Sequence, residues 1–324
     1  MLITPDTIVG IFKAGIADGS VLKLRGEFPR LLLTGKVWAD GIVLDCAEAT
    51  LRDWKLTRVE GVRFQGGTFT TTGMGKAMNL LESRRVSFAA PAFLGPEHIA
   101  PGEVYVPPTG YGLWATDCED VSVEDGKFSG FRMGLVFGRV VRFGVVRNDF
   151  SRMSGDGGDF TNCQDGLVAE NSVSGLQRFD ATHPDGFQFI SKAGAPRCAR
   201  IVVLDNLMIV QGQGIYFGDN YKDQLGHQDI AITGNVIRSA YSNAIAAART
   251  DGVTVTDNRV STLALAPHRA SINLPDCTDV VRAGNTVAAG AGLRSADDPV
   301  VGTPVDPDVA GLRAKIAAAQ AALA

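Results

Sequence analysis

Short stretches with alternating apolar positions recur along the chain, and each ends at an Asn or a Gly. Residues 201–206 (IVVLDN), 230–235 (IAITGN) and 253–258 (VTVTDN) show the order clearly: two apolar residues flank a third position, and Asn follows three positions later. Successive side chains of a strand point to opposite faces, so this order predicts short strands with one buried face. We expect the Asn or Gly to mark a tight bend, in which a left-handed or bridge backbone conformation is accessible and the Asn amide bonds locally.

These bends repeat at a nearly regular spacing. From Gly126 onward the successive separations are 22, 23, 35, 29, 23 and 27 residues, at Asn148, Asn171, Asn206, Asn235, Asn258 and Asn285. Helical hairpin repeats need about 33 residues or more and a 3.6-residue period, which is absent here. Coils of about 22 residues, stacked with their strands ~4.8 Å apart, fit a parallel β-helix. The sequence therefore predicts an all-β solenoid of about ten coils, with loops inserted into the two longest coils.

The two ends of the chain depart from this repeat. Residues 1–41 are expected to form an N-terminal cap and first coil, residues 42–292 the parallel β-helix, and residues 293–324 a C-terminal linker and helix. Within them, residues 7–17 (TIVGIFKAGIA) predict a short amphipathic helix that plugs the first coil. The Ala-rich residues 312–323 (LRAKIAAAQAAL) predict a helix that either covers the C-terminal end or helps a homotrimer to associate.

Charge and hydropathy narrow the class of partner. The net charge of −4 provides no basic footprint, so nucleic acid is not an expected partner. No apolar run approaches the ~20 residues that a membrane span requires, and the N-terminus carries no basic segment followed by an apolar one. We therefore expect a protein made in the cytoplasm without a signal peptide.

Stacked coils place equivalent residues in columns, and one alignment gathers several polar side chains. Its reference is an inward apolar column formed by Leu113, Leu135, Phe160, Phe187, Ile215, Ile245 and Ile272. Gly112, Gly134, Gly186 and Gly214 precede that column and suggest a bend that resets the alternation. On this alignment an outward patch contains Asp156, His183, Asp185, Gln188, Gln213, Tyr216, Tyr241 and Asn243, and Asp219 and Arg249 follow the strands.

The patch has the residue types that sugar recognition needs. Amides and carboxylates bond to hydroxyl groups, and aromatic rings pack against flat apolar sugar faces. Gln188, Gln213, Tyr216, Asp219, Tyr241, Asn243 and Arg249 are therefore the predicted glycan-binding residues. Asp156, His183 and Asp185 are the candidates for acid–base chemistry, because two carboxyl groups and an imidazole on neighbouring coils suit glycosidic hydrolysis. The alternative is that Asp185 and Gly186 form a turn and His183 caps a loop.

A hard cation is a further option at the same place. Asp156, Asp159 and Asp185 carry oxygen ligands of the type that Ca²⁺ prefers. No EF-hand loop occurs, and residues 154–159 (SGDGGD) are equally explained as a Gly-rich turn. The sequence thus assigns no metal ligands and leaves Ca²⁺ as one alternative.

Residues 42–292 resemble the right-handed parallel β-helix superfamily of pectate lyases, polygalacturonases and phage tailspikes. The residues that carry the resemblance are the repeated coils and the stretch Thr182-His-Pro-Asp-Gly-Phe-Gln188, which looks like the HPDG[IF]Q segment of β-helix proteins from bacteria and their phages. The NTD, GHG and RIK motifs of polygalacturonases do not occur. The resemblance implies a polysaccharide partner but does not determine the reaction, because one fold hosts many functions.

Three functions follow as expectations. The first is a virion-associated, trimeric spike of phage type that binds a bacterial surface polysaccharide and either only holds it or also cleaves it as a depolymerase. The second is a cellular polysaccharide lyase or glycoside hydrolase. The third is a structural or adhesion protein without catalysis.

Overall fold

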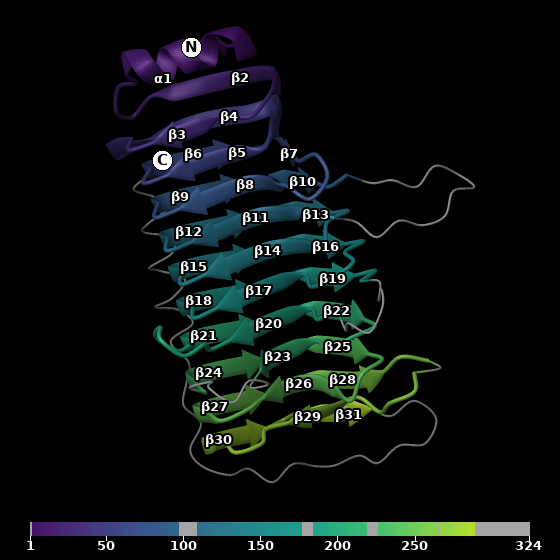
Figure 1. The fold of residues 1–324 in the computed structure, drawn as a ribbon. Helices are drawn as coiled ribbons and strands as arrows, with labels where there is room; N and C mark the ends of the chain where they lie inside the picture. The colour runs from purple at the N-terminus through teal and green to yellow at the C-terminus, as the bar shows by residue number, and fades with distance from the viewer. Residues whose placement is uncertain (1, 97–108, 177–183, 219–225, 265, 289–324) are drawn as a thin grey trace, which may run out of the picture.

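The chain folds into a solenoid whose coils stack from the N-terminal cap downward (Figure 1). The computed structural model describes residues 2–96, 109–176, 184–218, 226–264 and 266–288. All strand pairs are parallel, and each strand pairs with its equivalent in the next coil. A typical coil contains one strand of a ten-stranded sheet, followed by two strands of a larger sheet. This arrangement is the right-handed parallel β-helix that the repeat and the resemblance predicted.

The strands form three rows along the solenoid. The ten-stranded sheet consists of β3 (Leu32–Thr34), β5 (Trp54–Thr57), β8 (Lys76–Leu81), β11 (Tyr111–Thr116), β14 (Met133–Gly138), β17 (Gly158–Thr161), β20 (Phe187–Ile190), β23 (Ile215–Gly218), β26 (Asn243–Ala247) and β29 (Ser271–Asn273). One row of the larger sheet consists of β6 (Glu60–Gln65), β9 (Arg84–Ala89), β12 (Glu119–Glu124), β15 (Val141–Val146), β18 (Gln164–Ala169), β21 (Ala199–Leu204), β24 (His227–Thr233), β27 (Thr250–Thr256) and β30 (Thr278–Ala283). Its other row consists of β7 (Thr68–Thr70), β10 (Ala92–Leu94), β13 (Lys127–Ser129), β16 (Asp149–Ser151), β19 (Ser172–Ser174), β22 (Leu207–Val210), β25 (Val236–Ser239), β28 (Arg259–Thr262) and β31 (Thr286–Ala288). The long strand β4 (Val37–Arg52) pairs with both β6 and β7 and so joins the two rows.

Phenylalanine rings fill the interior in stacks that follow the coils. Phe93, Phe128 and Phe150 stack with centroid separations of 4.6 and 4.8 Å. Phe189 and Phe217 stack at 4.2 Å. These separations match the distance between neighbouring parallel strands, so each ring covers the ring of the next coil and the core continues along the axis.

The recurrent Asn residues form a buried ladder between coils, and of the two backbone conformations predicted for them the left-handed one is wrong. The residue before each Asn has the positive φ, as at Arg147 (55°) and Asp205 (51°). Asn206 donates from Nδ2 to Oδ1 of Asn235 (2.9 Å), and its own Oδ1 accepts from Nδ2 of Asn171 (2.9 Å). Asn is required at this position because its amide has both a donor and an acceptor and so bonds in both directions along the axis.

The N-terminal end is covered by helix α1 (Pro5–Ala14), with β1 (Leu2–Ile3) pairing to β2 (Val21–Phe28). The helix overlaps the segment predicted from residues 7–17, but it starts earlier and its C-cap is Gly15, whose φ of 98° suits glycine. Ile8 and Phe12 are buried against the first coils. The predicted C-terminal helix, residues 312–323, lies outside the described residues. No helix in the described part of the chain is long and apolar enough to cross a membrane.

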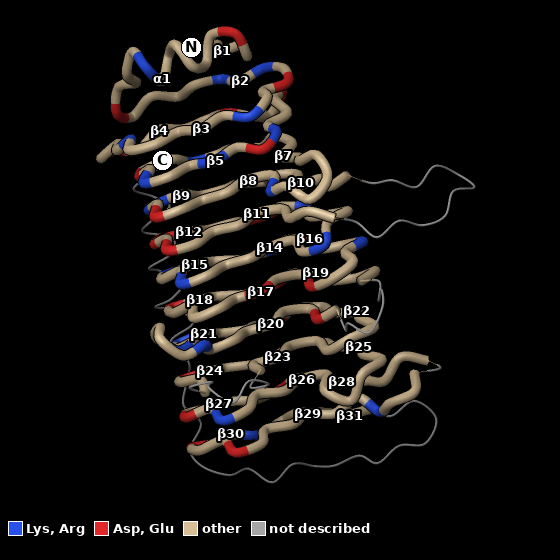
Figure 2. The backbone as a smooth tube through the Cα atoms, viewed as in Figure 1, with Lys and Arg blue, Asp and Glu red and all other residues tan. Residues whose placement is uncertain are grey.

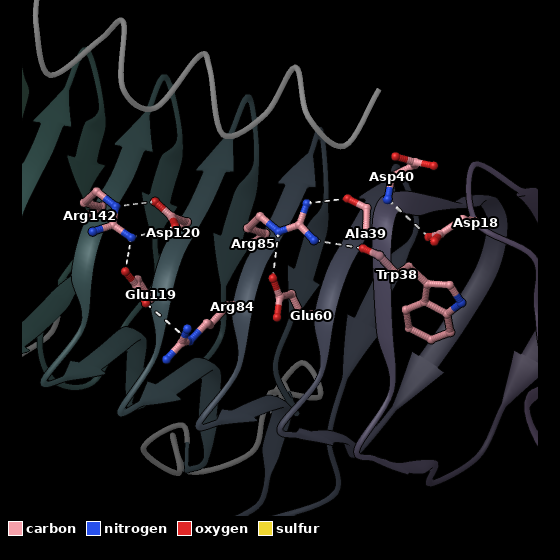
Figure 3. A network of polar contacts seen from close by, with 10 residues as sticks. All are labelled: Asp18, Trp38, Ala39, Asp40, Glu60, Arg84, Arg85, Glu119, Asp120 and Arg142. Atoms are coloured by element: carbon pink, nitrogen blue, oxygen red, sulfur yellow. Dashed lines mark hydrogen bonds and ion pairs between the residues drawn. The ribbon is translucent and has the colours of Figure 1, made fainter.

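Ion pairs connect neighbouring coils along one edge. Figure 2 shows acidic and basic segments following one another beside β9, β12, β15 and β18. Arg142 bonds to Asp120 (2.7 Å), and Arg147 bonds to Asp125 (2.8 Å). Figure 3 shows a related clamp near the N-terminus, where Arg85 donates to Glu60 (3.1 Å) and to the backbone oxygen of Trp38 (2.9 Å). The clamp holds the irregular part of β4, whose register with β6 shifts between Val37 and Ile42.

Candidate functional site

The outer face of the ten-stranded sheet has a continuous column of side chains, one per coil, which we call the outer column. Strand register places its members one above the next: Leu32, Lys55, Asn79, Trp114, Val136, Asp159, Gln188, Tyr216, Ala246 and Asn273. Because neighbouring parallel strands lie ~4.8 Å apart, the column presents a new side chain at each such step. It is mixed in chemistry, with amide, aromatic, acidic and basic members.

The predicted alignment is correct for most coils and wrong by two residues in β17. Leu135 pairs with Gly158, whereas Phe160 pairs with Phe189 one coil further on. Asp159 therefore occupies the outer column, where the predicted alignment places the residue after Phe160, Thr161. The same shift aligns Asp156 with Asp185 of the next coil.

Close packing of backbones explains the glycines that precede the inward apolar column. A Cβ added at Gly134, Gly157 or Gly186 would lie under 3.0 Å from the carbonyl oxygen of the equivalent residue in the next coil. These residues are not in the left-handed region, so they are glycine because of this close approach. Gly157 belongs to the set and was missed. Aligning it with Gly186 would have given the correct register from the sequence.

Asp156 and Asp185 are buried, so the predicted outward placement is wrong for both. Asp185 has no exposed surface, and Asp156 is 6% exposed. Oδ1 of Asp156 accepts from the backbone N–H of Asp185 (2.7 Å), and Oδ1 of Asp185 accepts from the backbone N–H of Gln213 (3.2 Å). The two carboxylates thus tie successive coils together, while Oδ2 of Asp185 accepts from Nε2 of Gln188 (3.1 Å). Burial and repulsion by Asp185 raise the pKa of Asp156 well above its usual range.

Asp159 presents a carboxyl group on the outer face. It is half-buried on β17, next to Gln188 in register, and its Oδ1 accepts from the hydroxyl of Thr161 (3.1 Å). Burial raises the pKa of Asp159, and the charge of Asp185 adds to that effect, although Thr161 and Lys192 act in the opposite direction. A surface carboxyl group that keeps its proton more readily than usual is suited to general-acid chemistry.

Two aromatic residues and a lysine form a cluster two coils toward the N-terminus from Asp159. We call it the Trp114 group, and it consists of Lys76, Tyr111 and Trp114. The ring of Trp114 packs edge-on against Tyr111 with centroids 4.9 Å apart. Nζ of Lys76 lies 3.6 Å from the centroid of the Trp114 ring. Nε1 of Trp114 donates to the hydroxyl of Thr116 (2.9 Å), which fixes the ring. Burial, with a contribution from Lys55, lowers the pKa of Lys76.

Toward the C-terminus the same face contains a cleft of about 720 Å³. Tyr216, Asn243, Asn273, Asp276 and Arg282 are among its lining residues. Tyr216 is only 8% exposed, and the predicted binding residues Tyr216 and Asn243 meet here. The outer column and this cleft therefore share one face.

The other predicted binding residues have different surroundings. Gln213 is 2% exposed, so its predicted outward orientation is wrong. Tyr241 lines a separate cleft of about 270 Å³ with Gln211 and His268, and its ring packs 5.6 Å from that of His268. Arg249 is exposed in the turn after β26, with φ of 46°. His183 and Asp219 lie outside the described residues.

The acidic residues do not form a metal cage in the described part of the chain. Across residues 2–96, 109–176, 184–218, 226–264 and 266–288, no group of three or more His, Cys, Asp or Glu side chains is arranged to hold a metal ion. Asp156 and Asp185 instead direct oxygen atoms toward backbone N–H groups.

Comparisons with known proteins agree with this architecture. The family described as right handed beta helix region matches residues 106–261. A search of curated proteins finds no match in sequence. Among solved structures, Dettilon tailspike protein (gp208) has a TM-score of 0.58 and 13% identity over 89% of this chain and 62% of that chain. The chain thus spans less than two thirds of that tailspike.

Two further solved structures are similar over most of both chains. PfbA, a surface adhesin of Streptococcus pneumoniae, has a TM-score of 0.54 and 11% identity, covering 92% of this chain and 84% of that one. DFA-IIIase from Arthrobacter chlorophenolicus A6, solved in complex with GF2, has a TM-score of 0.53 and 12% identity, covering 95% and 84%. At these identities the likeness establishes the shared fold.

Proposed function

Because the chain folds into a right-handed parallel β-helix, we propose that it binds a polysaccharide along the outer face of its ten-stranded sheet. The observation that carries the proposal is the outer column, in which Trp114, Asp159, Gln188 and Tyr216 follow one another along the axis. A linear polymer matches this shape, because the column offers one side chain per coil along a line.

The chemistry of the face supports a glycan in particular. Trp114 is half-buried and offers a ring for the apolar side of a pyranose. Gln188 and Asn243 supply amides for hydroxyl groups, and Asn273 is exposed beside the C-terminal cleft. The similarity in fold to a tailspike, a surface adhesin and DFA-IIIase is consistent with this class of ligand.

Binding is tested with a panel of acidic and neutral bacterial polysaccharides in affinity electrophoresis. Trp114→Ala should weaken retardation by the bound polymer roughly tenfold. Leu207→Ala is the matched control, because Leu207 is an exposed apolar residue (49%) on β22, outside this face. Equal retardation of the two variants would contradict the proposal.

A second candidate function is cleavage of the bound glycan, which is favoured by the half-buried carboxyl group of Asp159 beside Gln188 on this face and by its raised pKa. Asp159 would donate a proton to the glycosidic oxygen, as the acid of a glycosidase does. The catalytic assignments of Asp156 and Asp185 remain predictions, and their burial suits a supporting electrostatic role better than contact with a sugar. A lyase reaction is the alternative route.

Cleavage is measured as new reducing ends together with the ultraviolet absorbance of unsaturated uronates. Asp159→Asn should abolish new ends while retaining binding, and absorbance separates a lyase from a hydrolase. New ends that persist in Asp159→Asn would reject Asp159 as the acid. If the unmodified protein binds the polysaccharide but produces no new reducing ends, the protein is an adhesin without cleavage activity.

The similarity to a tailspike is the basis for the biological setting that we propose. In this setting the protein is a homotrimeric, virion-associated spike of phage type that is made in the cytoplasm and recognises a bacterial surface glycan. Tail or capsid genes beside the coding gene would support this setting, and sugar-uptake genes would favour a cellular enzyme. Sedimentation equilibrium tests the trimer, and a monomer at every concentration would reject it.

A further inference from the structure

Two lysines on the proposed polysaccharide-binding face differ from the arginines of the solenoid edge in their ion pairing. Arg139, Arg142, Arg147 and Arg200 each bond to a carboxylate of the preceding coil. Among the described residues, neither Lys55 nor Lys76 has a carboxylate within ion-pair distance. Within that part of the chain, the positive charges of Lys55 on β5 and Lys76 on β8 therefore have no neutralising carboxylate.

The two lysines lie beside the Trp114 group in a fixed arrangement. Lys76 pairs with Tyr111 in register, and its Nζ rests over the Trp114 ring. Lys55 pairs with Asn79, which in turn pairs with Trp114. Both lysines are half-buried, so their stems are held against the sheet. The ammonium groups are close enough that Lys55 disfavours the charged form of Lys76.

We propose that Lys55, Lys76 and Trp114 form a subsite for an acidic sugar, a pyranose that carries a carboxylate or sulfate group. The inference rests on the proposed polysaccharide function and names its substrate class. The anion lies between the two ammonium groups, and the sugar ring packs on the exposed part of Trp114. Binding relieves the repulsion between the lysines, which gives an anionic sugar an advantage that a neutral sugar lacks.

Trp114 provides a local readout of this subsite. The chain has three tryptophans, of which Trp38 (4% exposed) and Trp54 (1%) are buried. A change in tryptophan fluorescence on adding a glycan therefore reports mainly on Trp114. The probes are polygalacturonate and its fully methyl-esterified form, dextran sulfate and dextran, together with the bacterial polymers of the binding panel. Each of the first two pairs differs in charge while the backbone is retained.

The variants are Lys55→Gln, Lys76→Gln and Lys76→Arg, with Lys127→Gln as the matched control. Lys127 is exposed on β13, which belongs to the other sheet. Each Gln substitution on the face should weaken binding of an anionic polymer by about tenfold, because a charge-assisted contact is lost. Lys76→Arg should retain binding, Lys127→Gln should change nothing, and added salt should weaken only the anionic interaction.

The outcomes distinguish failure of the acidic-sugar subsite from failure of the proposed polysaccharide binding. Neutral polymers bound as tightly as anionic ones, with Lys55→Gln and Lys76→Gln unaffected, would overturn the acidic-sugar subsite and leave polysaccharide binding standing. No binding of any polymer would overturn both. Carboxylated and sulfated probes that differ in affinity would identify which anion the subsite prefers.

Discussion

The backbone N–H of Asp185 donates to Oδ1 of Asp156 across 2.7 Å, which makes a side chain of one coil part of the backbone bonding of the next. Both carboxyl groups are buried, and they belong to the column that also contains Gln213. The conspicuous acidic residues of the sequence thus contribute to the stacking of coils, while Asp159 presents its carboxyl group to the outer face.

Asp156→Asn should preserve the bond to Asp185 and remove a buried charge. The folded pKa of Asp156 is raised, so its stabilising contribution is full below the unfolded value of 3.8 and is lost as pH rises through the folded pKa. The variant should therefore be more stable at neutral pH, on the order of 1 kcal/mol, and its stability should depend less on pH. Denaturant unfolding measures this, with the exposed Asp40→Asn as control. A destabilised Asp156→Asn would show that the ionised carboxylate is needed.

His227 should make the fold sensitive to acid. It is buried, its Nδ1 lies 3.0 Å from the hydroxyl of Ser191, and burial lowers its pKa from 6.5 to about 4. Since the folded pKa is depressed, stability is full above 6.5 and falls as pH decreases toward 4, by roughly 3 kcal/mol.

The pH dependence of the unfolding free energy is assigned to His227 by comparing the unmodified protein with His227→Gln. The difference between their unfolding free energies should shrink as pH falls through that window, whereas the exposed His268→Gln should follow the unmodified protein. A constant difference would mean that His227 does not titrate on unfolding in this range.

The Asn ladder should be one of the strongest polar contributions to stability. Asn206 accepts from Asn171 and donates to Asn235 and to the backbone oxygen of Val168. Asn206→Ala leaves buried partners unsatisfied and should cost about 2 to 4 kcal/mol, whereas the exposed Asn273→Ala should cost little. Thermal unfolding followed by circular dichroism provides the comparison, and equal melting temperatures would contradict the role of the ladder.

The glycines that precede the inward apolar column should not tolerate a methyl group. A Cβ at Gly186 would lie under 3.0 Å from the carbonyl oxygen of Gly214, which is backbone and cannot move aside. Gly186→Ala should therefore destabilise the fold by a few kcal/mol. In Gly138→Ala the nearest atoms are 3.8 and 3.9 Å away, so that variant should fold normally. Soluble yield and melting temperature measure both.

Period-2 patterns determined the fold but left the register of single coils open. Inward residues such as Leu113 and Ile215 were identified correctly, because burial depends on alternation. A register error of one residue would place these apolar side chains on the exposed face, which the alternation contradicts. The error at Phe160 is two residues, which keeps the same face inward, so alternation does not reveal it. Because of this error, the predicted alignment leaves Asp159 off the outer face.

Burial of polar side chains was harder to predict than burial of apolar ones. Asp185 and the ladder Asn residues were expected at exposed or turn positions because isolated Asp and Asn favour such positions. Their burial depends on backbone N–H groups of the next coil, which become neighbours only after stacking. The repeated offset of Asn was the available signal, since a bend alone accepts Gly or Asp equally well.

The most direct test of the account is hydroxyl-radical footprinting with a polymer that the protein binds. The account predicts protection of Trp114 and Tyr216 on the ten-stranded sheet, with unchanged oxidation of Leu207 and Ile209, which are exposed on β22. Protection of Leu207 and Ile209 with no change at Trp114 would place the glycan on another face and contradict the central claim.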